Sequence, residues 1–262
     1  MPDVDFVILG GTGFVGSELC SCLKHNGASV LAIDSRNYIR HRGTSADVLV
    51  NCNGNAFRFK ANQNPTWDFE ASVITVEQSL SDFVVQLYVY ISTVDVYNIL
   101  MDPEQNHEAY PIRPEKLDYY GFNKWIAERL VEKYAKRSLI LRLGSVIGNG
   151  MQKGPLYDLL NAKPLHMSLD SELSFIDTST IARVISVIVA MGLSGEIINL
   201  TGTGSAKLRD LSSMLPSSVQ FGSGAHTVTH RYNINNTKIR GIMPIPTSLE
   251  VAKHYVGDQT IR

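Results

Sequence analysis

Residues 5–16 read Asp-Phe-Val-Ile-Leu-Gly-Gly-Thr-Gly-Phe-Val-Gly, an apolar run that leads into a glycine-rich turn. The short apolar run is typical of a strand buried on both faces of a sheet. From residue 14 to about residue 26 the apolar residues recur at helical spacing, and Gly27 ends that pattern. The stretch therefore predicts a strand, a tight turn and a helix in direct succession.

The same alternation continues along the chain. Further strands are expected at residues 29–33, 47–51, 87–91, 138–143 and 196–200. Further helices are expected at residues 65–83, 119–137, 178–191, near 207–215 and at 247–255. Because strands that alternate with helices pair in parallel, the sequence predicts an α/β fold with a doubly wound parallel sheet of the Rossmann-like kind.

The bulk composition restricts the class of protein. Of the 262 residues, 44% are hydrophobic and 19% are charged, which suits one large domain or a domain with a small annex. The formal net charge of −1 creates no global attraction to nucleic acid or to an acidic membrane, so neither is an expected partner. Cys20, Cys22 and Cys52 are too few for a zinc shell, and no secretory leader precedes them, which predicts a cytoplasmic protein without a bound metal.

The glycines of the first turn indicate a dinucleotide site. Gly10, Gly13 and Gly16 stand three residues apart between the strand and the helix, so that the backbone and the helix N-terminus can approach a pyrophosphate. Asp34, eighteen residues past Gly16 at the end of the second strand, is placed to accept hydrogen bonds from the adenosine ribose, which favours NAD. Arg36 nearby would suit a 2′-phosphate, so NADP stays open. The expected cofactor-binding residues are Gly10, Thr12, Gly13, Phe14, Val15, Gly16, Asp34, Ser35, Arg36, Cys52, Asn53, Gly54, Tyr120 and Lys124.

A second group of residues indicates acid–base chemistry. Tyr120 and Lys124 are four residues apart in an expected helix, so their side chains project from one face. An ammonium group near a phenol favours the phenolate, which can then exchange a proton with a carbinol oxygen. Thr93 ends a predicted strand where an open sheet binds its ligand, and it can orient the same oxygen. We therefore expect Thr93, Tyr120 and Lys124 to be catalytic.

Taken together, these motifs resemble the extended short-chain dehydrogenase/reductases, the NAD-dependent epimerase/dehydratase family, which acts mostly on nucleotide sugars. The resemblance is carried by residues 10–16, 90–97 (Tyr-Ile-Ser-Thr-Val-Asp-Val-Tyr), 120–124 (Tyr-Gly-Phe-Asn-Lys) and 141–148, with further counterparts at 174–177 and 198–200. It implies hydride transfer by a bound NAD, and a homodimer that pairs the helices at 65–83 and 119–137.

The chain departs from the family pattern at several positions. Dehydratases of the family carry an Asp-Glu pair after the catalytic threonine, where this chain has Val94 and Asp95. Ser145 replaces the usual asparagine of the substrate region, and Leu173 stands where an arginine is expected. Asp95 and Ser145 are therefore candidate substrate residues, together with Thr93. The span from Asp34 to the strand at 47–51 is also short for a family that usually fits another strand and helix there.

These observations favour an NAD(P)-dependent oxidoreductase or epimerase that acts on a sugar carbon, with a nucleotide sugar as the expected substrate. Three alternatives stay open: a reductase of a smaller, non-nucleotide carbonyl, a nucleotide-sugar dehydratase, and a dinucleotide-binding protein without turnover. A break in the regular pattern at residues 144–150 separates an expected dinucleotide-binding domain, residues 1–145, from a small substrate-binding region, residues 146–262, that folds partly back onto it.

Overall fold

The computed structural model describes residues 2–55, 57–215, 219–225 and 228–260. Contacts within the chain divide it into two units, and the chain passes between them more than once. The first unit contains residues 1–98, 111–142 and 181–198, and the second contains residues 99–110, 143–180 and 199–262. None of the described helices is long and apolar enough to cross a membrane.

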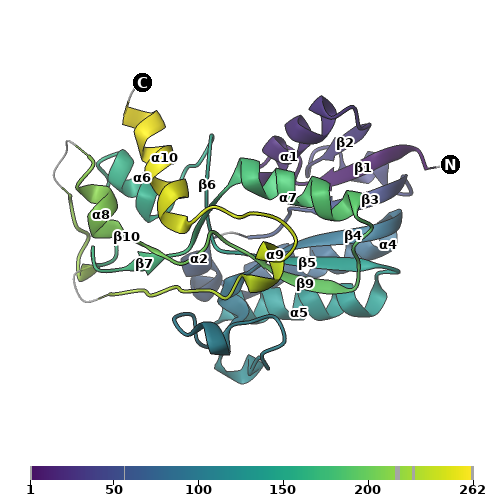
Figure 1. Ribbon diagram of the computed structural model, residues 1–262. Coiled ribbons are helices and arrows are strands. Elements are labelled where there is room, and N and C mark those ends of the chain that lie inside the picture. Colours follow the sequence, from purple (N-terminus) through teal and green to yellow (C-terminus); the bar gives the residue numbers. More distant parts are fainter. Residues whose placement is uncertain (1, 56, 216–218, 226–227, 261–262) are drawn as a thin grey trace. The chain divides into compact units, whose positions relative to one another are not determined.

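A six-stranded sheet forms the centre of the first unit (Figure 1). Its strands are β1 (Val4–Leu9), β2 (Val30–Ile33), β3 (Ser45–Asn51), β4 (Val84–Thr93), β5 (Ser138–Leu143) and β9 (Glu196–Leu200). Their order is β2-β1-β3-β4-β5-β9, and the pairs β1–β2, β1–β3 and β3–β4 are parallel. The chain order reverses between β1 and β3, and in open α/β sheets such a point is where ligands bind, at the carboxyl ends of the strands.

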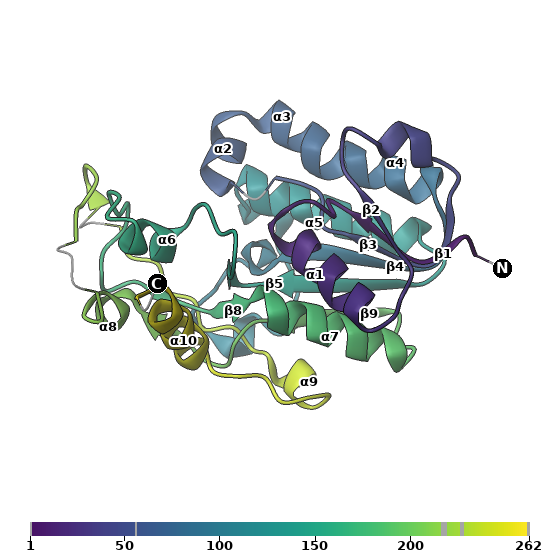
Figure 2. The ribbon, with the colours of Figure 1, turned by 90° about the horizontal axis from the view of Figure 1, so that it is seen from above.

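Helices cover both faces of this sheet, which confirms the predicted doubly wound α/β fold. Figure 2 shows α1 (Phe14–His25) and α7 (Thr178–Ala190) on one face, and α4 (Thr75–Asp82) and α5 (Tyr119–Tyr134) on the other. The inner strands are buried on both faces, and the apolar residues of residues 7–9 have no exposed surface. Because both faces of the inner strands are buried, the run at residues 6–9 is apolar throughout and does not alternate with polar residues.

Three expected helices differ from the structure. The helix expected at 65–83 consists of α3 (Pro65–Phe69), a π-helical turn η2 (Glu70–Ile74) and α4, so it is not one regular helix. The helix expected at 119–137 ends at Tyr134, and the one near 207–215 is the shorter α8 (Leu208–Ser212).

The chain between β2 and β4 holds further differences. An additional helix, α2 (Arg58–Gln63), precedes α3 and was not expected. Between β2 and β3 the chain forms a single 3₁₀ turn, η1 (Tyr38–His41), so β2 is the edge of the sheet, as the short span predicted.

The second unit is built from short elements. Its two small sheets pair β6 (Ser145–Ile147) with β8 (Phe175–Asp177), and β7 (Glu172–Leu173) with β10 (Ala206–Lys207). Its helices are α6 (Pro155–Leu160), α8, α9 (Thr237–Arg240) and α10 (Ser248–Thr260), together with the turn η4 (Pro103–Gln105). Asn199, which is fully buried, donates its amide to the backbone carbonyls of Asn106 and Asn235, each at 2.8 Å. This side chain ties together three distant stretches of the second unit.

Candidate active site

The turn between β1 and α1 has room only for glycine at three positions, Gly10, Gly11 and Gly16. Gly10 adopts a φ of +72°, which favours a residue without a side chain. A Cβ atom on Gly16 would lie 2.2 Å from the carbonyl oxygen of Gly10, so the first turn of α1 packs directly on the loop. Gly13, the N-cap of α1, has no side chain to cap the helix. The backbone at the start of α1 is therefore suited to a phosphate group, as the glycine spacing predicted.

The end of β3 lies against this turn. A Cβ atom on Gly10 would lie 2.8 Å from the side-chain oxygen of Asn53 and 3.2 Å from the carbonyl carbon of Cys52. A Cβ atom on Gly54, which follows Asn53, would lie 3.3 Å from Nζ of Lys124. The structure thus brings the expected cofactor residues at the ends of β1 and β3 together, and connects them to the expected catalytic lysine.

At the end of β2, Asp34 is held by its neighbours. Thr12 donates its hydroxyl to the Asp34 carboxylate at 3.1 Å, and the backbone amide of Arg36 donates to it at 2.9 Å. The guanidinium of Arg36 forms an ion pair with the same carboxylate. The hydrogen bonds from Arg36, followed by that from Thr12, hold the pKa of Asp34 well below its usual range. Ser35 is exposed between the two charged residues. The Asp34 carboxylate and the Arg36 guanidinium, the two groups expected to select between NAD and NADP, therefore contact each other.

The expected catalytic side chains lie where β4 ends and α5 begins. Thr93 is the last residue of β4, and its hydroxyl donates to the carboxylate of Asp95 at 3.1 Å. Tyr120, in the first turn of α5, is 7% exposed. Burial raises the pKa of the Tyr120 phenol and the charge of Asp95 raises it further, whereas a hydrogen bond with Thr93 lowers it. In the protein alone the tyrosine is therefore held in its protonated form.

Lys124 lies one turn further along α5 and is also buried. Its ammonium group donates to the hydroxyl of Tyr90 at 3.2 Å and to the carbonyl oxygen of Ile91 at 3.1 Å. Burial lowers the pKa of Lys124 to about 8. In the structure, Thr93 and, more weakly, Arg58 lower the pKa of Tyr120. The effect of the Lys124 ammonium on that pKa stays a prediction.

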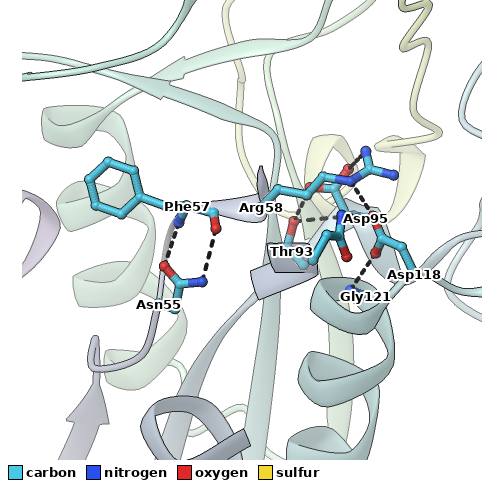
Figure 3. Close-up of polar contacts among 8 residues, drawn as sticks. Asn55, Phe57, Arg58, Thr93, Asp95, Asp118 and Gly121 are labelled. Atoms are coloured by element: carbon cyan, nitrogen blue, oxygen red, sulfur yellow. Dashed lines mark hydrogen bonds and ion pairs between the residues drawn. The ribbon is translucent and has the colours of Figure 1, made fainter. Parts of the chain in front are cut away.

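Arg58 is a site residue that the sequence analysis missed. Figure 3 shows its side chain between the carboxylates of Asp95 and Asp118. The Nε atom of Arg58 donates to Asp118 at 2.5 Å, and a terminal nitrogen donates to Asp95 at 3.3 Å. Asp118 is the N-cap of α5 and also accepts the backbone amide of Gly121 at 2.9 Å. Arg58 thus connects α2 to Asp95, which follows β4, and to Asp118 at the start of α5.

The backbone before Arg58 is shaped by Asn55. The side chain of Asn55 accepts the backbone amide of Phe57 at 2.6 Å and donates to the carbonyl oxygen of the same residue at 3.0 Å (Figure 3). No local motif marks this arrangement, because the partners of Arg58 are 37 and 60 residues away in the sequence. The signal that could have found it is a lone arginine after a predicted strand end.

Hydrogen bonds join Thr12 and Arg36 to Asp34 and Thr93 to Asp95, and the chain approaches closely between Gly10 and Asn53 and between Gly54 and Lys124. The roles expected for Phe14, Val15 and Ser35 stay predictions. Ser145 belongs to the second unit, where it begins β6 and its backbone amide donates to the carbonyl oxygen of Ser174 at 2.8 Å. Its role toward a substrate stays a prediction.

The sequence and the fold were compared with those of known proteins. Residues 4–193 match the family described as the RmlD substrate binding domain. No curated protein sequence matches the chain. Among solved structures, MoeE5 in complex with UDP-glucose and NAD is similar, with a TM-score of 0.82 and 16% identity over 98% of this chain and 99% of that chain.

Two further structures resemble the chain over nearly its whole length. UDP-glucuronic acid 4-epimerase from Bacillus cereus, in complex with UDP-glucuronic acid and NAD, has a TM-score of 0.80 and 18% identity over 98% of this chain and 99% of that chain. TunA, an NAD-dependent NDP-hexosamine 5,6-dehydratase involved in tunicamycin biosynthesis, has a TM-score of 0.80 and 14% identity over 99% of both chains. At these identities the likeness establishes the fold.

Proposed function

The chain belongs to the RmlD substrate-binding domain family of the extended short-chain dehydrogenase/reductases, and we propose that it is an NAD-dependent oxidoreductase or epimerase of a nucleotide sugar. The proposed reaction is hydride transfer at a sugar carbon, with Tyr120 and Lys124 as the acid–base pair. The observation that supports the proposal is the hydrogen bond between Thr93 and Tyr120 together with the approach of Lys124, one turn along the same helix, to Gly54, which follows the Asn53 side chain that packs on Gly10. A protein that only binds a dinucleotide would not need these three side chains together.

The residues around the glycine turn fit a dinucleotide. The N-terminus of α1, where Gly13 brings no side chain to cap the backbone amides, is suited to the pyrophosphate. The Asp34 carboxylate, which its hydrogen bonds keep ionised, would accept the ribose hydroxyls and disfavour a 2′-phosphate. Two of the similar structures contain NAD, which supports the same cofactor here.

The proton would move through Tyr120. Bound NAD supplies an acceptor for hydride and a positive charge beside the phenol, and that charge would oppose the effect of burial on the Tyr120 pKa. Tyr120 as phenolate would take the proton of the sugar hydroxyl while Thr93 orients that oxygen. Lys124, which approaches Gly54 at the cofactor side, would hold the nicotinamide ribose.

The position of Asp95 bears on the alternatives. Asp95 accepts hydrogen bonds from Arg58 at 3.3 Å and from Thr93 at 3.1 Å, so its carboxylate is held as an acceptor. A dehydratase needs an acid that can protonate the departing hydroxyl. This geometry therefore favours an epimerase or a reductase over a dehydratase, although TunA shows that the fold also serves a dehydratase.

The product formed from a nucleotide hexose tests the proposal. The purified protein would be incubated with UDP-glucose and NAD, and separately with a 4-keto nucleotide sugar and NADH, and the products would be followed by mass. A product of unchanged mass indicates an epimerase, and a gain of two hydrogens with stoichiometric loss of NADH indicates a reductase. Loss of water without net consumption of the cofactor would show a dehydratase and contradict the proposal. Turnover of small carbonyls alone would contradict the nucleotide-sugar assignment.

A further inference from the structure

Asp68 is a fully buried carboxylate whose hydrogen-bond partners are all neutral. It lies in α3 and accepts the side-chain amide of Asn55 at 2.9 Å, the hydroxyl of Ser72 at 3.1 Å and the side-chain amide of Asn123 at 2.7 Å. These donors come from the segment after β3, from η2 and from α5. Three donors from separate segments of the chain therefore hold this carboxylate in place.

The other carboxylates around the Tyr–Lys pair are matched by cations. Glu128 forms an ion pair with the buried Arg142 at 2.7 Å, and Arg58 pairs with both Asp95 and Asp118. Among the described residues no lysine, arginine or histidine forms an ion pair with Asp68. Its negative charge is therefore left without a contacting cation.

Lys124 shows the complementary arrangement. Its contacts are the neutral oxygens of Tyr90 and Ile91, and within the described part of the chain no carboxylate forms an ion pair with it. A buried charge without compensation is costly. A charge elsewhere in the low-dielectric interior can supply that compensation, because the interaction extends beyond contact distance.

The hydrogen-bonded group around Asp68 lies beside Lys124: a Cβ atom on Gly54 would lie 3.3 Å from Nζ of Lys124 and 3.7 Å from the hydroxyl of Ser72, which donates to Asp68. The charge of Asp68 is the largest influence that raises the Lys124 pKa against burial, followed by Glu128 and Cys52. Glu128 is neutralised by Arg142, and burial raises the pKa of the Cys52 thiol to about 12, so that it is uncharged at neutral pH. Asn123 contacts Asp68 directly and precedes Lys124 in α5.

We propose that Asp68 is a positioning residue that keeps the buried Lys124 ammonium protonated through its charge, without contacting it. The three neutral donors hold the carboxylate in place and leave its charge intact, whereas an arginine partner would cancel it. The importance of this charge for catalysis rests on the function proposed above for Lys124. The electrostatic effect of Asp68 on Lys124 does not depend on that function.

The test is the titration of Lys124 in the protein without cofactor. The protein would be labelled with ¹³C at lysine Cε, and the Lys124 resonance would be assigned by its loss in Lys124→Met. In Asp68→Asn the charge is removed and the shape is kept, because the Asn123 amide can turn to accept from the new side chain. We expect the Lys124 midpoint to fall by about one pH unit or more.

Two further variants separate charge from packing. Ser72→Ala removes one donor to Asp68 but keeps the charge, so the Lys124 midpoint should move much less. The exchange Asp68→Asn with Asn123→Asp places the carboxylate on the other side of the same hydrogen bond and should restore the midpoint. Rescue of this kind is not expected if Asp68 only fills space.

An unchanged midpoint in folded Asp68→Asn would overturn the proposal, whatever reaction the protein catalyses. Asp68→Ser removes the same charge with a smaller side chain. The titration of Lys124 would be made on this variant if Asp68→Asn does not fold. If neither neutral variant folded while the exchanged pair did, the carboxylate would serve folding and not Lys124, which would also overturn the proposal. Failure to turn over nucleotide sugars would contradict the proposed function and leave this titration unaffected.

Discussion

A single oxygen atom distinguishes Tyr120 from phenylalanine, and the proposed proton transfer depends on it. Tyr120→Phe should keep the fold and the affinity for NAD, because the ring remains in its buried place. Turnover should fall by about 10²–10⁴-fold, the usual effect of losing a positioned proton-transfer group. Steady-state kinetics and a cofactor titration on the same preparation measure both effects. Tyr119→Phe is the matched control, because this neighbour is 55% exposed and should retain activity. Full activity in Tyr120→Phe would remove the tyrosine from the mechanism.

Cofactor choice also belongs to single residues. Asp34→Ala removes the carboxylate that pairs with Arg36, so the guanidinium becomes able to bind a 2′-phosphate. NAD(H) should bind more tightly than NADP(H) to the parent protein, and the variant should narrow that difference. Fluorescence titration with NADH and NADPH measures it. Adding Arg36→Ala to Asp34→Ala should abolish the increase in affinity for NADPH. A preference of the parent for NADPH would refute the assignment of Asp34.

At the scale of elements, α5 is joined to β5 by a buried ion pair. Glu128 and Arg142 are both buried, and their side chains share two hydrogen bonds, at 2.9 and 2.7 Å. Glu128→Ala would leave the buried Arg142 charge with the hydroxyl of Tyr97 at 2.8 Å but without a carboxylate, which costs about 3–5 kcal/mol of unfolding free energy. Urea denaturation measures the loss. Glu132→Ala on the same helix is the control, because its ion pair with Arg129 is partly exposed and should contribute at most about 1 kcal/mol. Equal losses of unfolding free energy in Glu128→Ala and Glu132→Ala would contradict the larger contribution expected of the buried ion pair.

The elements that the sequence predicted best are those with strong local signals. β1 and α1 follow from the apolar run and its glycines. The candidate Thr93 follows from its place at a strand end, and the candidates Tyr120 and Lys124 follow from their four-residue spacing in a helix. The π-helical turn in α3–α4 was missed, because apolar spacing does not reveal a shift from i→i+4 to i→i+5 hydrogen bonds.

The rest of the site depends on contacts between distant residues. α2 is short and polar, and its position is fixed by Arg58 contacting residues far along the chain. The role of Asp68 depends likewise on Asn123, which is 55 residues away. No periodicity in a single sequence encodes such pairs, because each partner alone is an ordinary polar residue.

For the whole molecule, the predicted assembly is a homodimer. Exposed apolar side chains lie on the helices that the family resemblance assigns to the interface, namely Phe69, Ile74, Phe122 and Tyr134. Burial of such side chains against a second copy would favour association. Sedimentation at micromolar concentration should show a dimer, and Ile74→Glu should weaken it. Ile39→Glu changes an apolar residue that is exposed in the η1 turn, outside these helices, and should not weaken the dimer. A monomer in the parent protein would count against the assignment.

The interleaved order of the two units affects how the protein is made. The first unit is complete only when residues 181–198 have been added, because β9 is the edge strand beside β5. A ribosome that adds about 5–20 residues per second needs about 3–11 s to pass from the end of β5 to residue 198. During that time the nascent chain already contains Tyr120 and Lys124, but β5 presents an unpaired edge, which is prone to associate with other chains. Pausing or premature termination before residue 198 should therefore yield aggregates rather than a smaller active enzyme, and a chaperone that shields strand edges should raise the yield.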